Sequence, residues 1–366
     1  MGDLRGARVA VIGGGVLGLA TAVCLAGAQA RVVLYELRDL DDNASGVAAG
    51  MLAPAFEVVL DPLSTGHFSL LHAARDHWPL FVQQFDLPRD ALDRSGAIWV
   101  GGPGEEAGLA SMLQRLAAQG AEAEALSPAQ VRKLQPMLSH DVTGGVLAAQ
   151  DWLLDPQRVL PAMRRALQRL GGGIVHARVE LSGETLLVDG VRLPTDAVIL
   201  AAGAEGAAWK DMAPELAAVT PIKGQIVHLD AAPTSGPVVR AAFGYVAPQG
   251  RGAVVGATME TGVADLQTDP LAVAGLQAGA AQLFPHLASV TGQGRAGVRA
   301  TTPDGLPMVG PSSRPGLLLA LGARRNGWLL GPMVAQIILG QLLGEAAQPC
   351  ALALDPLRRF DPLMQL

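Results

Sequence analysis

The most constraining feature of the chain is a segment near its start, where residues 9–30 contain no charged side chain. About 20 apolar residues are enough to cross a bilayer. Arg5 and Arg8 come before the segment and Ala28-Gln29-Ala30 ends it, as in a secretory signal with its cleavage site. The three consecutive glycines at 13–15 argue against both interpretations, because they interrupt the continuous helix that a membrane requires.

The residues that follow favour a third interpretation. Residues 31–35 are rich in β-branched and large apolar side chains, as in a buried strand of a parallel sheet, and Glu36 closes them with an acid. The segment therefore predicts a strand at 8–12, a glycine turn, a helix at 16–28 and a second strand at 31–35. This order is one βαβ unit.

The turn of this unit carries the pattern Gly13-x-Gly15-x-x-Gly18. The first glycine permits a tight turn, the second lets backbone amides approach a pyrophosphate, and the third lets the helix pack closely on the strands. The helix N-terminus attracts phosphate, and Glu36 is placed to accept hydrogen bonds from a ribose. We therefore interpret the unit as a dinucleotide-binding site.

Composition limits the remaining classes of protein. The chain has 366 residues, of which 50% are hydrophobic and 16% charged, which is enough for two domains with a sizeable core. Its net charge of −6 and lack of a basic block argue against nucleic-acid binding. Cys24 and Cys350 form no disulfide or zinc pattern, the seven histidines have no metal-like spacing, and a reduced, cytoplasmic compartment fits.

Two kinds of segment alternate along the chain. Residues 64–140 are expected to be mostly helical, whereas 220–295 have β character with one helix near 270–284. Between them we expect a hairpin at Asp189-Gly190 and a buried strand at 197–201. The apolar helix expected at 328–343 is short for a membrane span and follows a strand and turn, so we interpret it as buried core.

Several motifs, taken together in this order, are more specific than the glycine pattern. They are ASGVAAGMLAP (44–54), VILAAGAEG (198–206), PIKGQ (221–225), GVRATTPDGLPMVGP (297–311) and RNGWLLGP (325–332). With the βαβ unit, they resemble the glycine oxidase branch of the D-amino-acid oxidase superfamily, which are FAD-dependent amine oxidases. The resemblance implies an α/β fold with a Rossmann-like, glutathione-reductase-like FAD domain and an α+β substrate domain with a mainly antiparallel sheet. The FAD domain would comprise residues 1–80, 141–219 and 296–366, and the substrate domain 81–140 and 220–295.

The resemblance also assigns a cofactor site. Residues 322–328 would begin a helix that faces the flavin ring. FAD would be held noncovalently, because Gly297 lies near the place where related sarcosine oxidases carry the linking cysteine. The cofactor-binding positions that the resemblance implies are Gly13, Gly15, Val16, Leu17, Gly18, Glu36, Ser45, Ala48, Ala49, Gly50, Met51, Val179, Ala202, Gly203, Arg299, Arg325, Asn326, Gly327 and Trp328.

A substrate site follows from the same resemblance. Arg299 matches the arginine that pairs with the substrate carboxylate, and a guanidinium is a planar, two-pronged donor suited to that group. Tyr245 matches the tyrosine that bonds the same carboxylate. Met51 and Met259 match apolar walls, and Arg325 matches an arginine near the entrance. Phe243 and Trp328 complete the expected pocket.

The reaction implied is oxidation of glycine or a related small or N-substituted amino acid to an imine by hydride transfer to flavin N5, with O2 reduced to H2O2. Water would hydrolyse the imine to a 2-oxo acid and an amine. The alternatives are a larger N-carboxymethyl amine as substrate, a quinone as electron acceptor, a noncatalytic flavin- or NAD-binding protein, and an NAD-dependent dehydrogenase. No basic amphipathic helix indicates a membrane partner, and homo-oligomers occur in the family.

Overall fold

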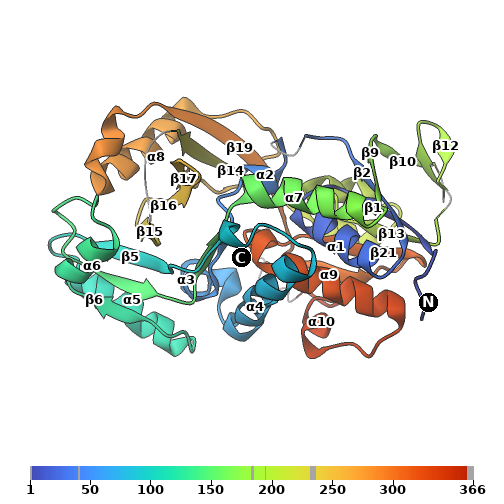
Figure 1. Ribbon diagram of the computed structural model, residues 1–366, viewed down its shortest axis with the longest axis horizontal. Coiled ribbons are helices and arrows are strands. Elements are labelled where there is room, and N and C mark those ends of the chain that lie inside the picture. Colours follow the sequence, from blue (N-terminus) through green and yellow to red (C-terminus); the bar gives the residue numbers. More distant parts are fainter. Residues whose placement is uncertain (1, 40–41, 183–184, 194, 231–235, 361–366) are drawn as a thin grey trace.

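The computed structural model describes residues 2–39, 42–182, 185–193, 195–230 and 236–360, and it consists of two bodies that lie side by side along the long axis (Figure 1). Each body is organised around one large sheet. Among the described residues, six strands form the first sheet in the order β20-β21-β13-β1-β2-β9. All neighbours in it run parallel except the antiparallel pair of β20 and β21.

The first sheet combines segments from the start, middle and end of the chain. Its strands are β1 (Arg8–Ile12), β2 (Arg31–Glu36), β9 (Gly173–His176), β13 (Ala197–Leu200), β20 (Met308–Pro311) and β21 (Leu317–Leu321). Every residue of β13 is buried, as expected for a strand covered on both faces.

Helices cover this sheet and explain why the first segment carries no charge. Helix α1 (Val16–Gly27) is buried from Val16 to Ala26, because it packs against both α9 (Gly327–Leu343) and α7 (Pro156–Arg169). Helix α4 (Phe68–Gln84) packs on α9, where the Trp78 indole donates a 2.8 Å hydrogen bond to the Trp328 carbonyl. The predicted burial of the apolar C-terminal helix is confirmed. No helix within the described ranges is both long and apolar enough to span a membrane.

The second sheet is larger and mainly antiparallel, with β15 and β5 as a parallel pair. Its order is β18-β14-β17-β16-β15-β5-β7-β6, and β19 pairs with β14 along the whole length of β14, on the edge opposite to β17 and β18. Its strands are β5 (Ala97–Gly101), β6 (Glu124–Leu126), β7 (Gly144–Ala148), β14 (Thr220–Leu229), β15 (Val238–Ala241), β16 (Gly244–Gln249), β17 (Gly252–Gly256), β18 (Glu260–Thr261) and β19 (Gly292–Thr301).

Helices and small sheets complete the described elements. The helices are α2 (Ala44–Val47), α3 (Pro54–Leu60), α5 (Glu106–Ala118), α6 (Pro128–Leu134), α8 (Pro270–Leu283) and α10 (Pro349–Ala353). One small sheet joins β3 (Met51–Leu52), β8 (Trp152–Leu154) and β4 (Leu92–Asp93). Another joins β10 (Val179–Ser182), β11 (Thr185–Val188) and β12 (Val191–Arg192). Short 3-10 turns lie at Pro62–Ser64, Arg89–Ala91, Gly203–Trp209, Pro214–Ala218 and Pro285–Ser289.

The predicted fold class is confirmed, and so is the βαβ unit, whose helix ends one residue earlier than expected. The expected hairpin lies between β11 and β12, with positive φ at both Asp189 and Gly190. Residues 64–140 are less helical than expected, because β5 and β6 lie within them and pair with β7. The domain boundaries remain a proposal, and the pairing of β7 with β5 favours moving the boundary at 141 to a point after β7.

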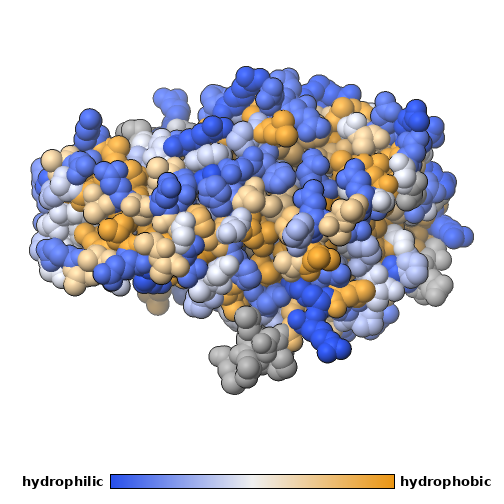
Figure 2. Space-filling model, turned by 90° about the horizontal axis from the view of Figure 1, so that it is seen from below, coloured by the Kyte–Doolittle hydropathy of each residue, from blue (hydrophilic) through white to orange (hydrophobic). Residues whose placement is uncertain are grey.

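The surface is chemically mixed. On the face drawn in Figure 2, hydrophobic residues are interspersed with hydrophilic ones. Large exposed apolar side chains include Leu80 on α4 and Leu271 on α8, which belong to different bodies. Scattered apolar residues of this kind are usual on protein surfaces and do not by themselves mark a docking site.

Candidate active site

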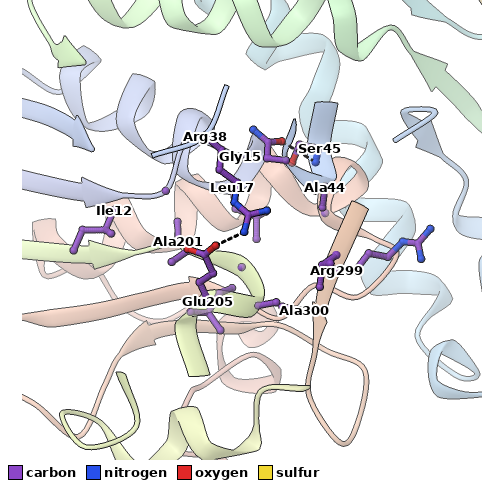
Figure 3. A pocket seen from close by; sticks show the side chains of 18 of the residues that line it. Ile12, Gly15, Leu17, Arg38, Ala44, Ser45, Ala201, Glu205, Arg299 and Ala300 are labelled. Atoms are coloured by element: carbon purple, nitrogen blue, oxygen red, sulfur yellow. Dashed lines mark hydrogen bonds and ion pairs between the residues drawn. The ribbon is translucent and has the colours of Figure 1, made fainter. Parts of the chain in front are cut away.

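A cavity of about 600 Å³ lies where the strands of the first sheet end and β19 of the second sheet passes by (Figure 3). In doubly wound sheets, ligands bind at the carboxyl ends of the parallel strands. The ends of β1, β2 and β21 line this cavity, together with residues 298–300 of β19 and the first residues of α1 and α9. Its volume is within the range of roughly 300–1,000 Å³ that is usual for cofactor pockets.

Each glycine of the first turn is needed for a different structural reason. Gly13 has a φ of 109°, and a Cβ there would lie 2.4 Å from the Ala201 carbonyl oxygen. A Cβ on Gly18 would lie 1.9 Å from the Gly13 carbonyl oxygen, so a side chain would force α1 away from the turn. Gly15 caps α1 without a side-chain hydrogen bond, and the next amide, of Val16, donates to the Ser45 hydroxyl at 2.9 Å. The start of α1 is therefore open to a phosphate group.

Glu36 is fixed at the end of β2 by backbone amides. Its carboxylate accepts hydrogen bonds from Gly14 N–H, from Leu37 N–H at 2.7 Å and from Arg38 N–H at 2.9 Å. The Arg38 guanidinium then forms a 2.5 Å ion pair with Glu205, drawn as a dashed line in Figure 3. Arg38 and Glu205 both line the cavity and were missed by the sequence analysis.

The opposite end of the cavity is rich in arginine. Arg299 on β19 and Arg325 before α9 both line it, and Figure 3 shows Arg299 on the side away from Ile12. The Arg325 guanidinium lies 3.3 Å from the buried Glu57 carboxylate of α3. Its neighbour Arg324 binds the buried Asp61 carboxylate through two nitrogens, at 2.6 and 3.1 Å. Glu57 in the first turn of α3 and Asp61 directly after that helix thus hold these two arginines.

Arg299 lies across a glycine of the neighbouring strand. In the antiparallel pair of β14 and β19, a Cβ on Gly224 would lie 2.1 Å from Arg299 Nη1. This contact explains the glycine in the motif PIKGQ. Nη1 of Arg299 is inaccessible to water and has no hydrogen-bond partner. A buried donor without a partner costs free energy, so such an atom marks a place where a ligand group can bind.

Tyr245 lies within electrostatic range of Arg299, although it does not line the cavity. Burial raises the pKa of the Tyr245 phenol, and the charges of Arg299, Arg240 and Arg325 oppose that rise. Burial lowers the pKa of the Arg299 guanidinium, while Tyr245 and Glu57 act in the opposite direction. The phenol and the guanidinium predicted to bind one carboxylate therefore act on each other's charge.

The structure brings most of the predicted positions to one cavity. Those that line it are Gly13, Gly15, Val16, Leu17, Glu36, Ser45, Ala48, Val179, Ala202, Gly203, Arg299, Arg325, Gly327 and Trp328. Trp328 also has a structural contact, because its indole donates to the Ser45 carbonyl at 3.0 Å.

Other predicted positions support the site from outside its lining. Gly50 packs against β8, where a Cβ would lie 1.9 Å from the Leu154 carbonyl oxygen. Ala49 is buried in the core, and the buried Asn326 donates its backbone N–H to the Ala323 carbonyl at the start of α9. The Met51 sulfur lies 3.1 Å from Arg240 Nη2.

Phe243 and Met259 are not brought to the cavity. Phe243 lies in the turn between β15 and β16, where its ring faces Gly279 of α8 and joins the core under that helix. Met259 follows β17 with 39% of its side chain exposed.

The residues present fit a dinucleotide that carries a redox ring. The glycine turn, the open start of α1 and Glu36 suit the phosphates and a ribose, and the arginine-rich end leaves an unpartnered donor for a substrate. The fold and site therefore define a dinucleotide-dependent enzyme of the two-body α/β class. No cluster of three potential metal ligands occurs in the part of the chain that the structure describes.

The chain belongs to the DAO family of FAD-dependent oxidoreductases, whose family model matches residues 8–340. The chain is 31% identical to the bifunctional protein ThiO/ThiG of Nostoc sp. over 93% of its own length, but it spans only 53% of that relative. It is 29% identical to the glycine oxidase of Pseudomonas aeruginosa, covering 92% of this chain and 95% of that one. The crystal structure of glycine oxidase from Geobacillus kaustophilus superposes with a TM-score of 0.81 at 25% identity, covering 97% of this chain and 100% of that one.

Proposed function

We propose that the protein oxidises glycine or a related small or N-substituted amino acid. The observation that carries this proposal is the unpartnered, buried Nη1 of Arg299 at one end of the cofactor cavity. A guanidinium in this position is completed by a carboxylate, which accepts two parallel hydrogen bonds. Similarity to the glycine oxidase of Pseudomonas aeruginosa supports the same substrate class.

The contribution of the protein to the reaction is positioning. FAD, when bound, supplies a hydride acceptor for the substrate α-carbon. Arg299 and the Tyr245 hydroxyl would fix the carboxylate and thereby the direction of the α-hydrogen, which is catalysis by orientation. Gly224 leaves space for the Arg299 side chain, and Glu57 holds Arg325 beside it. The N-terminus of α9 at the cavity would favour negative charge there.

Anaerobic mixing of the FAD-loaded enzyme with glycine, sarcosine, D-alanine, D-proline and an N-carboxymethyl amine tests this function. The expected result is loss of flavin absorbance with at least one of these amines, followed by peroxide when air is admitted. If none of them reduces the flavin, the proposed function is wrong. Reduction without peroxide in air would instead favour a dehydrogenase that passes electrons to another acceptor, such as a quinone.

A further inference from the structure

A second buried arginine lies in the same sheet as Tyr245, beyond the residues that line the cavity. Arg240 on β15 is only 3% exposed, and it stands directly opposite Tyr245 on β16. Its Nε is buried without a hydrogen-bond partner, and its Nη2 faces the Met51 sulfur at 3.1 Å. A thioether is a weak acceptor, so this contact leaves a charged donor poorly satisfied. The flexible methionine can move aside for a stronger acceptor.

The nearby acids do not neutralise this arginine at close range. Asp151 is the strongest opposite charge acting on Arg240, but its two oxygens accept from Ala55 N–H at 2.7 Å and Phe56 N–H at 3.0 Å. Burial raises the pKa of Asp151 to about 6, so Asp151 ceases to be a counter-ion as the pH falls below that value. Glu57 is paired with Arg325. Within the described residues, neither Arg240 nor Arg299 forms an ion pair.

The two arginines share electrostatic neighbours. The charges of both Arg299 and Arg240 act on the buried Tyr245 phenol, and Arg325 acts on both guanidiniums. One substrate carboxylate at Arg299 would satisfy that guanidinium and leave Arg240 with only the Met51 sulfur and the face of the Phe56 ring, 5.5 Å from its guanidinium carbon. A buried, unpaired cation is costly, so a second anionic group on the same ligand would be bound favourably.

We propose that Arg240 binds a second carboxylate of the substrate, so that the preferred substrates are amines with two carboxylate groups. This inference rests on the proposed amine oxidation and names its substrate class. The second carboxylate could be carried on the nitrogen substituent, as in iminodiacetate, or on the side chain, as in D-aspartate. In either case a single carboxylate binds Arg299 and the other binds Arg240.

The first test measures binding without turnover. Diglycolate carries two carboxylates and no amine, and methoxyacetate has a similar shape with one carboxylate. Each is titrated into the FAD-loaded enzyme while the flavin spectrum is followed. We expect diglycolate to bind about 10- to 100-fold more tightly, as befits an added charged hydrogen-bonded pair. Equal dissociation constants for the two ligands would overturn the inference without any variant.

The matched variants separate a substrate role from a structural one. Arg240→Met keeps the volume and removes the charge, whereas Arg75→Met removes another buried guanidinium whose charge also acts on Asp151. Arg75 donates to the Gln150 carbonyl and lies over the Trp152 ring. Its charge is not among those that act on the Tyr245 phenol. R240M should abolish the preference for diglycolate, and R75M should retain it. Equal loss in both variants would show that Arg240 acts only through Asp151.

Turnover identifies the source of the second carboxylate. Anaerobic flavin reduction is compared for iminodiacetate against N-ethylglycine, and for D-aspartate against D-2-aminobutyrate. An advantage for iminodiacetate places the second carboxylate on nitrogen, and one for D-aspartate places it on the side chain. If these four amines and the panel tested for the proposed function all fail, the proposed function fails, while the diglycolate titration still decides the role of Arg240. If amines react but neither dicarboxylate has an advantage, the inference is wrong.

Discussion

Arg299 depends on its neighbours for its position as well as on its own strand. Its guanidinium passes over Gly224 of β14, and its charge acts on Tyr245, which belongs to β16. These three residues come from strands that meet only in the folded sheet. A change at the glycine should therefore affect substrate binding even though the glycine itself has no chemical group to offer.

Gly224→Ala should lower kcat/KM for the best amine substrate by at least about tenfold, because the new methyl group would occupy the place of Arg299 Nη1. The atom it meets is the end of a long side chain, which can move, so the fold and the FAD content should be retained. Steady-state kinetics and the flavin spectrum measure both effects. Gly275→Ala on α8 is the control, since its Cβ would meet nothing within 4 Å. Wild-type kinetics in G224A would contradict the placement of Arg299.

Sequence motifs predicted Arg299 and Glu36 because these residues lie within recognisable local patterns, and the family resemblance added Tyr245. Arg240 and Glu57 have no such pattern around them, and their partners come from distant segments. A charged residue inside the otherwise apolar stretch at 238–241 was the available signal for Arg240. Phe243 lies in the turn between β15 and β16, and only its packing in the folded chain shows that it faces α8.

At the scale of elements, the local βαβ unit was predictable, whereas the strand pairings of the larger sheet were not. Helix α1 and its flanking strands are adjacent in sequence, so periodicity and glycine spacing define them. Strands β5 and β7, in contrast, pair with each other and join β15 from far along the chain. Such pairings depend on long-range contacts that a single sequence pattern does not contain.

Asp151 lies between β7 and β8 and binds the start of α3. It should make the free energy of unfolding depend on pH. Its carboxylate accepts from the first amides of α3, the helix that carries Glu57. Its pKa is raised from 3.8 to about 6 by burial, so the folded state holds the proton more tightly than the unfolded state. The resulting stabilisation is complete below about pH 4 and is lost as the pH rises through about 6.

Asp151→Asn cannot titrate, so the comparison with wild type isolates this effect. The free energy of unfolding of wild type relative to D151N should fall between about pH 4 and pH 7, by up to on the order of 3 kcal/mol. Urea denaturation at several pH values, at one fixed FAD concentration, measures the difference. A difference that does not change with pH would show that Asp151 is not the titrating group.

At the scale of the whole molecule, the cofactor cavity joins the two bodies. Its lining includes the strand ends of the first sheet and residues 298–300 of β19, which belongs to the second sheet. A ligand that contacts both should stabilise their arrangement, because binding to the folded state alone adds to the free energy of unfolding. Neither cysteine lines this cavity, and Cys24 is buried inside α1.

These placements predict that FAD is held noncovalently and acts as a link between the bodies. Acid precipitation should leave a colourless pellet and release the flavin into solution, because the cavity lining contains no cysteine or histidine to form a bond with it.

Apoprotein from which FAD has been removed should unfold at a lower temperature than the FAD-loaded enzyme. Adding FAD at 100 times its dissociation constant should restore about 2.7 kcal/mol. ADP, which lacks the ring that would reach β19, should bind more weakly and therefore raise the unfolding temperature less at the same ligand concentration. A yellow pellet would refute noncovalent binding, and equal stabilisation by ADP would show that contact with β19 does not contribute.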